Sequence, residues 1–186
     1  MDARLLAAFA AVARGRFLPP EERPFASLDA PLPIGFGVTN SQPSTVADML
    51  GLLDVHSGHS VLDVGAGSGW TTALLAQLVG PAGRVLGIER IPELAVRAAG
   101  AIVDWPWARI RASDPGVLGS PGEAPFDRIL VSAMATDLPA ALVEQLTPAG
   151  VLVVPVAGVM LRVTRSPDGA VGVTEHGWYN FVPLLP

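Results

Sequence analysis

Cysteine and lysine are both absent from this chain of 186 residues, and only 16% of its residues are charged. Without cysteine there is no disulfide scaffold, no thiolate metal site and no cysteine nucleophile, and we predict no metal site. The twelve basic residues are all arginine, lie scattered, and are outnumbered by acidic residues, which leaves a net charge of −5. Proteins that bind a phosphate backbone carry clustered basic residues, so we expect no nucleic-acid partner.

Long hydrophobic runs are also missing. The longest, Val151–Leu161, has eleven residues and is interrupted by Pro155 and Gly158. A helix that spans a bilayer needs about twenty apolar residues, so this run is too short to cross one. We therefore expect no membrane partner.

The apolar run at residues 5–13 has two interpretations. It resembles the hydrophobic region of a cleaved signal peptide, but no net positive charge precedes it, as such a signal requires. Leu5, Phe9 and Val12 instead share one face of a helix. We favour a packed amphipathic helix, and with it a cytoplasmic protein, over a cleaved signal.

The length of the chain predicts one domain, residues 1–186, which can bury roughly 70% of its unfolded surface. Residues 1–55 are expected to form an N-terminal helix and an ordered, proline-rich arm packed on the remainder. A second helix is predicted over 44–53, where Ser44 is a candidate N-cap. We expect the protein to be a monomer.

From residue 60 onward, short apolar runs alternate with amphipathic segments. The expected strands are 60–64, 84–88, 108–112, 126–131 and 150–155, and the expected helices are 70–79, 92–100 and 138–146. This alternation is typical of βαβ crossovers and of a parallel sheet with helices on both faces. Segments 159–165 and 170–176 flank a turn-forming Ser-Pro-Asp-Gly and predict a C-terminal antiparallel hairpin. The predicted fold class is therefore α/β, with a Rossmann-like, mostly parallel sheet.

Three glycines, Gly65, Gly67 and Gly69, alternate between the first strand of this pattern and its helix. Glycine permits positive φ and close approach of a ligand, and the helix N-terminus that follows favours an anion. The dinucleotide fingerprint would need glycine or alanine where this chain has Trp70. We therefore predict a small-molecule cofactor other than NAD, with a plain tight turn as the alternative.

Two acids follow the next strands. Glu89 ends the second strand, where a carboxylate can accept hydrogen bonds from both ribose hydroxyls of a nucleoside. Asp114 follows the third strand, at the edge where α/β folds bind ligands, and can accept from an adenine amino group. The alternatives are a solvated carboxylate for Glu89 and a turn-forming Asp-Pro-Gly for Asp114.

The spacing of these elements resembles that of the class I S-adenosylmethionine-dependent methyltransferases. In those enzymes an acid precedes the first glycine, as Asp63 does here. The resemblance implies that S-adenosylmethionine is the cofactor and that Asp63 orients its amino-acid end. It also implies that the helix N-terminus faces a carboxylate instead of a pyrophosphate.

Motifs outside the glycine loop resemble the protein-L-isoaspartate (D-aspartate) O-methyltransferase family from about residue 14 to the C-terminus. They are Arg16-Phe17-Leu18-Pro19, Pro31-Leu32-Pro33-Ile34-Gly35, Thr39-Asn40-Ser41-Gln42-Pro43, Ala124-Pro125-Phe126-Asp127-Arg128-Ile129 and Phe181-Val182-Pro183-Leu184. The Thr-x-Ser-Gln-Pro loop and the terminal Phe-Val-Pro-Leu are the most specific, because generic methyltransferases lack them. The family usually has a hydrophobic residue where this chain has Asn40.

The resemblance implies methylation of the free carboxylate of L-isoaspartyl or D-aspartyl residues in damaged proteins or peptides, the first step of repair. It implies that Ser41 positions this carboxylate with Thr39 beside it, and that Val182 and Pro183 line the peptide cleft. A carboxylate is already ionised at pH 7, so the reaction needs no general base, and the sequence offers none at a plausible position. Two alternatives stay open: another carboxylate acceptor, in a peptide natural product or a small molecule, and a non-catalytic cofactor-binding homologue.

Overall fold

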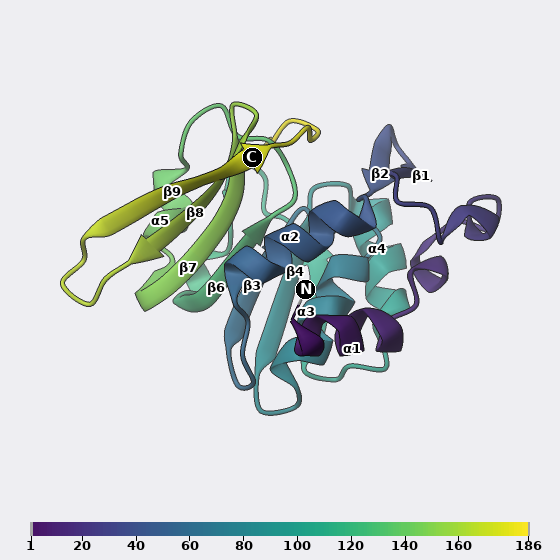
Figure 1. The fold of residues 1–186 in the computed structure, drawn as a ribbon, viewed down its shortest axis with the longest axis horizontal. Coiled ribbons are helices and arrows are strands. Elements are labelled where there is room, and N and C mark those ends of the chain that lie inside the picture. The colour runs from purple at the N-terminus through teal and green to yellow at the C-terminus, as the bar shows by residue number, and fades with distance from the viewer. Residues whose placement is uncertain (1, 186) are drawn as a thin grey trace.

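The computed structural model describes residues 2–185, which form a seven-stranded sheet, a two-stranded hairpin and flanking helices (Figure 1). The strands are β1 Leu32–Gly35, β2 Val38–Asn40, β3 Ser60–Val64, β4 Arg84–Glu89, β5 Ala108–Ala112, β6 Phe126–Val131, β7 Leu146–Val156, β8 Val159–Arg165 and β9 Val171–Trp178. The α-helices are α1 Ala3–Ala11, α2 Pro43–Leu53, α3 Trp70–Val79, α4 Pro92–Ala101 and α5 Ala140–Val143. Short 3₁₀ turns cover Arg14–Phe17, Arg23–Phe25 and Pro121–Glu123.

The large sheet has the strand order β5-β4-β3-β6-β7-β8-β9. Strands β3 to β7 pair in parallel, and β8 and β9 are added antiparallel. The chain moves outward from β3 in one direction through β4 and β5, then returns to the other side of β3 with β6. This reversal creates a switch point at the carboxyl ends of β3 and β6, where open α/β sheets bind ligands.

Helices cover both faces of the sheet unequally. Buried side chains of α1, α2, α3 and α4 form one apolar cluster with the sheet residues that point toward them. On the opposite face, the only α-helix among the described residues is the short α5, whose Leu142 packs against the second cluster. No helix within residues 2–185 is long and apolar enough to span a bilayer.

The predicted α/β class and its antiparallel C-terminal strands are confirmed. The predicted helix at 138–146 is largely wrong, because α5 covers only residues 140–143. Pro139 restricts the residue before it to extended conformations, so the helix cannot begin at Leu138. At the other end, Leu146 pairs with Phe126 and so belongs to β7.

The N-terminal helix packs as its spacing predicts: Leu5 is buried in α1, and Phe9 meets Trp70 edge-to-face with ring centroids 5.6 Å apart. The proposed cap of α2 is wrong. Helix α2 begins one residue earlier, at Pro43, and the backbone N–H of Ser44 donates to the Asp29 carboxylate at 2.9 Å. An acid from the arm therefore satisfies a free N–H of the first turn of this helix.

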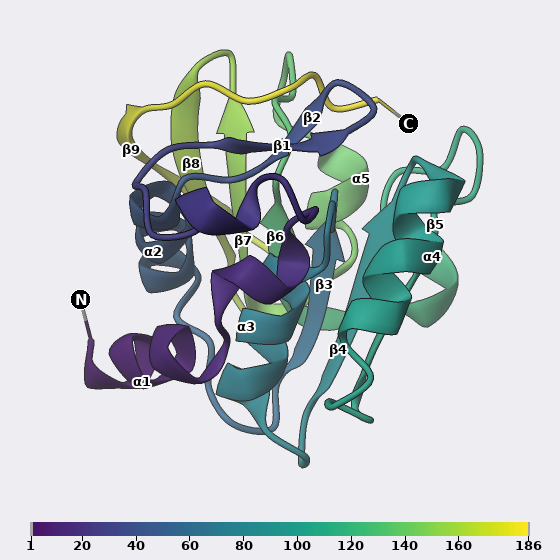
Figure 2. The ribbon, with the colours of Figure 1, turned by 90° about the vertical axis from the view of Figure 1, so that its right-hand side faces the viewer.

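The arm and the C-terminal segment meet above the carboxyl ends of the central strands. Figure 2 shows the β1–β2 hairpin and the yellow C-terminal segment side by side at the top of the molecule. Met134, just past β6, donates its N–H to the Val182 carbonyl and accepts from the N–H of Leu184, both at 2.7 Å. These two bonds hold the C-terminal segment over the switch point.

Candidate active site

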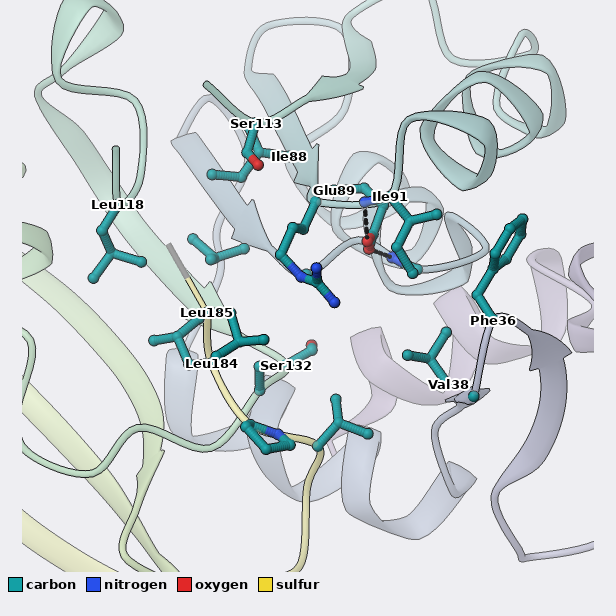
Figure 3. Close-up of a pocket in the computed structure, with 18 of the residues that line it drawn as sticks. Phe36, Val38, Ile88, Glu89, Ile91, Ser113, Leu118, Ser132, Leu184 and Leu185 are labelled. Atoms are coloured by element: carbon teal, nitrogen blue, oxygen red, sulfur yellow. Dashed lines mark hydrogen bonds between the residues drawn. The ribbon is translucent and has the colours of Figure 1, made fainter. Parts of the chain in front are cut away.

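A cavity of about 270 Å³ lies at the switch point, between the carboxyl ends of β3, β4 and β6, the β1–β2 hairpin and the C-terminal segment. Figure 3 shows Phe36 and Val38 on one side of it, Ser113 and Leu118 on the other, and Glu89 between them. A second cavity of about 290 Å³ adjoins it. Thr39, Ser132 and Val182 line both, so the two spaces share a wall.

The glycine loop forms one wall of the first cavity. Gly65, Gly67 and Gly69 have φ of +81°, +56° and +89°, as the alternating glycines predict. Gly65 and Gly67 line the cavity, whereas Gly69 lies beneath it. A Cβ on Gly69 would stand 3.1 Å from the Ile110 side chain and 3.2 Å from the Ala98 carbonyl oxygen. Gly69 therefore brings the start of α3 close to β5 and α4.

Trp70 follows this glycine and points to the other side of α3. It is buried, and its indole N–H donates to the Val12 carbonyl at 3.2 Å. The large ring therefore packs against the end of α1, while Gly69 makes the close approach to the sheet.

Glu89 reaches the first cavity from the end of β4 and is 7% exposed. One carboxylate oxygen accepts the N–H of Gly67 at 2.9 Å, and the other accepts the N–H of Ile91 at 3.0 Å (Figure 3). These bonds fix the carboxylate plane and tie it to the glycine loop. Each oxygen keeps a second lone pair for a ligand hydroxyl.

Asp63 is fully buried beneath the glycine loop and lines neither cavity. Its Oδ2 accepts the Thr72 hydroxyl at 2.6 Å, while its Oδ1 has no hydrogen-bond partner. Burial raises the pKa of Asp63 to about 7; the Thr72 hydrogen bond opposes this shift and the Glu89 charge adds to it. Asp63 therefore lies under the glycine loop, outside both cavities, and its Oδ1 lacks a hydrogen-bond donor.

Asp114 lies at the rim. Its carboxylate is exposed and pairs with Arg111 at 3.3 Å, whereas the preceding residue, Ser113, lines the cavity. The structure therefore brings Glu89, Gly65 and Gly67 to the cavity wall and leaves Asp114 at its edge.

The second cavity holds the other predicted residues. Ser41 lines it with Thr39 and Val182, while Pro183 lines the first cavity. Among the described residues, no charged side chain lines this second cavity, whose wall consists of Pro31, Thr39, Ser41, Gln42, Thr45, Ser132, Asn180, Phe181 and Val182. Hydroxyl and amide groups are its polar components, and they can orient an anion without introducing a cation.

Sequence reasoning missed Ser132 and the tip of the β1–β2 hairpin. Ser132 directly follows β6, so the rule that ligands bind at the carboxyl ends of parallel strands could have found it. Phe36 lines the first cavity with φ of +57°, at a turn that the irregular proline-rich pattern did not predict.

The described residues that line the two cavities include neither a cluster of metal ligands nor a histidine. Within residues 2–185 no three His, Asp or Glu side chains gather as metal ligands. No histidine lines either space: His56 pairs with Asp54 at 2.9 Å, and His176 lines a separate groove.

The residues that line the first cavity are of the kinds that S-adenosylmethionine requires. Its carboxylate at the end of β4 suits a ribose, and the apolar Ile88, Val117 and Leu118 suit the faces of an adenine ring. Gly67 borders the cavity with φ of +56°, a conformation that favours glycine, and a Cβ there would touch the Ile34 side chain at 3.5 Å. The volume of about 270 Å³ lies just below the range of roughly 300–1,000 Å³ for small-molecule sites.

Comparison with known proteins supports the same assignment. The sequence profile of the protein-L-isoaspartate (D-aspartate) O-methyltransferase family matches residues 1–186. The chain is 45% identical to a protein-L-isoaspartate O-methyltransferase of Methanopyrus kandleri, over 98% of this chain and 83% of that one. It is also 45% identical to the enzyme of that name from Anaeromyxobacter dehalogenans, over 98% of this chain and 90% of that one.

A solved structure shares the fold. It is a crystal structure of a Plasmodium falciparum protein described as a protein-L-isoaspartate O-methyltransferase, in complex with S-adenosyl-L-homocysteine. The TM-score is 0.84 at 24% identity, with 99% of this chain and 91% of that chain covered. The profile match and the near-complete overlap with relatives at 45% identity establish that this chain belongs to the protein-L-isoaspartate (D-aspartate) O-methyltransferase family, as an S-adenosylmethionine-dependent enzyme.

Proposed function

We propose that the protein methylates the free carboxylate of L-isoaspartyl or D-aspartyl residues in damaged peptides and proteins, with the first cavity for the cofactor and the second for the acceptor. The observation that carries this proposal is the shared wall: Thr39, Ser132 and Val182 line both spaces. When bound, S-adenosylmethionine supplies a methyl group on a positively charged sulfur.

The acceptor side orients an anion. Ser41 and Thr39 place hydroxyl donors in the second cavity, and Val182 and Pro183 border the cleft from the C-terminal segment. A carboxylate and a sulfonium neutralise each other as the methyl group moves, so a site poor in charge and water favours the transition state. An added cation would stabilise the ionised acceptor before the reaction, and the described lining of this cavity provides none.

On the cofactor side, hydrogen bonds from the protein hold the ligand. Glu89 accepts from the ribose hydroxyls, and Gly65, Gly67 and Gly69 shape the loop against the amino-acid end. Asp63 acts from beneath through this loop, and Asp114 borders the adenine end from the rim. Support for these assignments is the fixed Glu89 carboxylate, with backbone N–H groups at 2.9 and 3.0 Å.

We further propose that the enzyme acts as a monomer in the cytoplasm. Support for the first point is that one chain supplies residues to every wall of both cavities. For the second point, a chain without cysteine forms no disulfide and needs no oxidising compartment to fold.

The test is transfer of labelled methyl groups to a synthetic isoaspartyl peptide and to its normal aspartyl twin. We expect label on the isoaspartyl peptide alone, released by mild base as a methyl ester. Cofactor binding without label on either peptide would overturn the acceptor assignment. A panel of small carboxylates, assayed in parallel, would then separate a different acceptor from a non-catalytic protein.

A further inference from the structure

Arg14 lies buried at the base of the acceptor arm, where it gathers backbone carbonyls from several turns. Its guanidinium donates to the carbonyl oxygens of Leu28, Ala30 and Ser41 at 2.8–2.9 Å. It also donates to the Asn40 side-chain Oδ1 at 2.6 Å and stands 5.3 Å from the Trp70 ring centroid. No carboxylate within residues 2–185 forms an ion pair with it. The charge of Arg14 therefore serves to fix the backbone around Ser41.

Asn40 extends this network toward the cofactor loop. Its Oδ1 accepts from Arg14, and its Nδ2 donates to the Ser68 hydroxyl at 3.0 Å. Arginine can only donate, so the orientation of the amide follows from its partners. Asn40 and Ser68 are 4% and 6% exposed, and in such surroundings a hydrogen bond is stronger than it is in water.

Ser68 lies between Gly67 and Gly69, so the Asn40 side chain joins the loop that carries Ser41 to the loop that borders the cofactor cavity. Both loops line one small intervening space of about 30 Å³, together with Ser132. An apolar side chain at position 40 could fill the volume but could not bond to both partners.

We propose that Asn40 is a positioning residue that holds the Ser41 loop in register with the glycine loop through its bonds to Arg14 and Ser68. Asn40 lines neither the proposed cofactor cavity nor the proposed acceptor cavity, so it acts through Ser41 and Gly67. The inference rests on the proposed role of Ser41. A displacement of about 1 Å between reacting groups can cost a hundredfold in rate, so a fixed link between the two loops matters for turnover.

The test is a double-substitution cycle with Ser68→Ala and Asn40→Leu, assayed on the isoaspartyl peptide. Ser68→Ala removes one hydrogen bond and leaves those of Arg14 in place. We expect kcat to fall about fivefold to tenfold with cofactor Kd changed less than twofold. In the Asn40→Leu background, Ser68→Ala should change kcat by less than twofold, because its partner has already gone.

Ser60→Ala is the matched control. The Ser60 hydroxyl also accepts one side-chain hydrogen bond, from Arg84 at 2.7 Å, but it lies at the start of β3, far from the site. This variant should retain the wild-type kcat. A Ser68→Ala effect that is confined to cofactor Kd, or that persists in the Asn40→Leu background, would overturn the proposal.

A second measurement needs no active enzyme and no Asn40 variant. Hydrogen exchange of residues 38–42 should accelerate in Ser68→Ala, although the substitution is in the other loop, and should not change in Ser60→Ala. Unchanged exchange would overturn the link. An inactive wild type that still shows this acceleration would refute the proposed acceptor alone, so the two failures are distinguishable.

Discussion

The site has two halves, the first cavity with its lining (the cofactor half) and the second cavity with its lining (the acceptor half). The two halves are formed by different kinds of structural element. The cofactor half is centred on the turns that directly follow β3 and β4, where Glu89 accepts the N–H of Gly67, and the β1–β2 hairpin and the C-terminal segment complete its wall. The acceptor half combines residues 39–42, Ser132 and the C-terminal segment, which come together only in the folded chain. Arg14 holds its arm by hydrogen bonds to backbone carbonyls. The comparison teaches that neighbouring βα turns supply the centre of the cofactor half, whereas long-range hydrogen bonds hold the arm of the acceptor half in place.

The largest loss of stability is expected where the acceptor half depends on one side chain. Arg14→Met removes the donor from three partly buried carbonyls and from the buried Asn40 Oδ1, so the free energy of unfolding should fall by about 3 kcal/mol. Urea denaturation measures this change. The control Arg16→Ala removes an exposed pair with Asp104 and a contact with the Trp105 ring at 5.6 Å, and it should cost about 1 kcal/mol. Equal losses in the two variants would show that Arg14 does not hold the arm.

In the cofactor half, Asp63 is a buried carboxyl whose Oδ1 has no hydrogen-bond partner. The folded carboxyl, with a pKa of about 7 against an ordinary 3.8, keeps its proton over a range in which the unfolded chain has lost it. The folded state therefore binds more protons between these values, and the free energy of unfolding falls as pH rises through this window, on the order of 4 kcal/mol in total.

Asp63→Asn should flatten that pH dependence, because the amide does not titrate but can still accept the Thr72 hydroxyl. Denaturation curves at pH 4.5 and pH 8 measure the difference for both proteins. Asp48→Asn, at an exposed carboxylate that accepts the Tyr179 hydroxyl, is the control. A variant with the same pH slope as the wild type would contradict a protonated Asp63.

Glu89→Gln tests the cofactor half by ligand binding. The new amide places N–H₂ against the N–H of Gly67 or Ile91 and loses one acceptor for the ribose. We expect cofactor affinity to fall by about 1–3 kcal/mol, measured by calorimetry. Glu93→Gln, exposed in the first turn of α4, should leave affinity unchanged. Unchanged affinity in Glu89→Gln would remove the ribose assignment.

Asp114→Asn should have the smallest effect. The carboxylate is exposed and shared with Arg111, so cofactor affinity should change by less than about 0.5 kcal/mol. A tenfold loss, measured in the same titration, would show that the rim closes on the adenine end and that this carboxylate is part of the cofactor half.

The same comparison explains what the sequence could predict. Strands at 60–64 and 126–131 and the helix at 70–79 were correctly placed, because each is specified by its own apolar pattern. Glu89 and the glycines could be assigned from position alone, since they follow strands directly. The centre of the cofactor half can therefore be predicted from the local sequence.

The acceptor half is harder to predict from the sequence. Ser41 and Val182 are separated by most of the chain, and only a family resemblance linked them before the structure was known. No sequence pattern indicated the hydrogen bonds of Arg14. Every residue has a backbone carbonyl, so only the folded structure determines which carbonyls Arg14 contacts. The β1–β2 hairpin was missed for a similar reason. Its strands have only four and three residues, too few for a clear pattern, and Leu32 and Ile34 pack in one cluster with the distant Leu94.

The most direct test of the two-part site is Ser41→Ala, measured for both halves in one preparation. We predict that kcat/KM for the isoaspartyl peptide falls about tenfold, while Kd for S-adenosylhomocysteine stays within twofold. Ser166→Ala, in the exposed turn between β8 and β9, should change neither value. A parallel loss of cofactor affinity, or an unchanged kcat/KM, would contradict the division of the site into a cofactor half and an acceptor half.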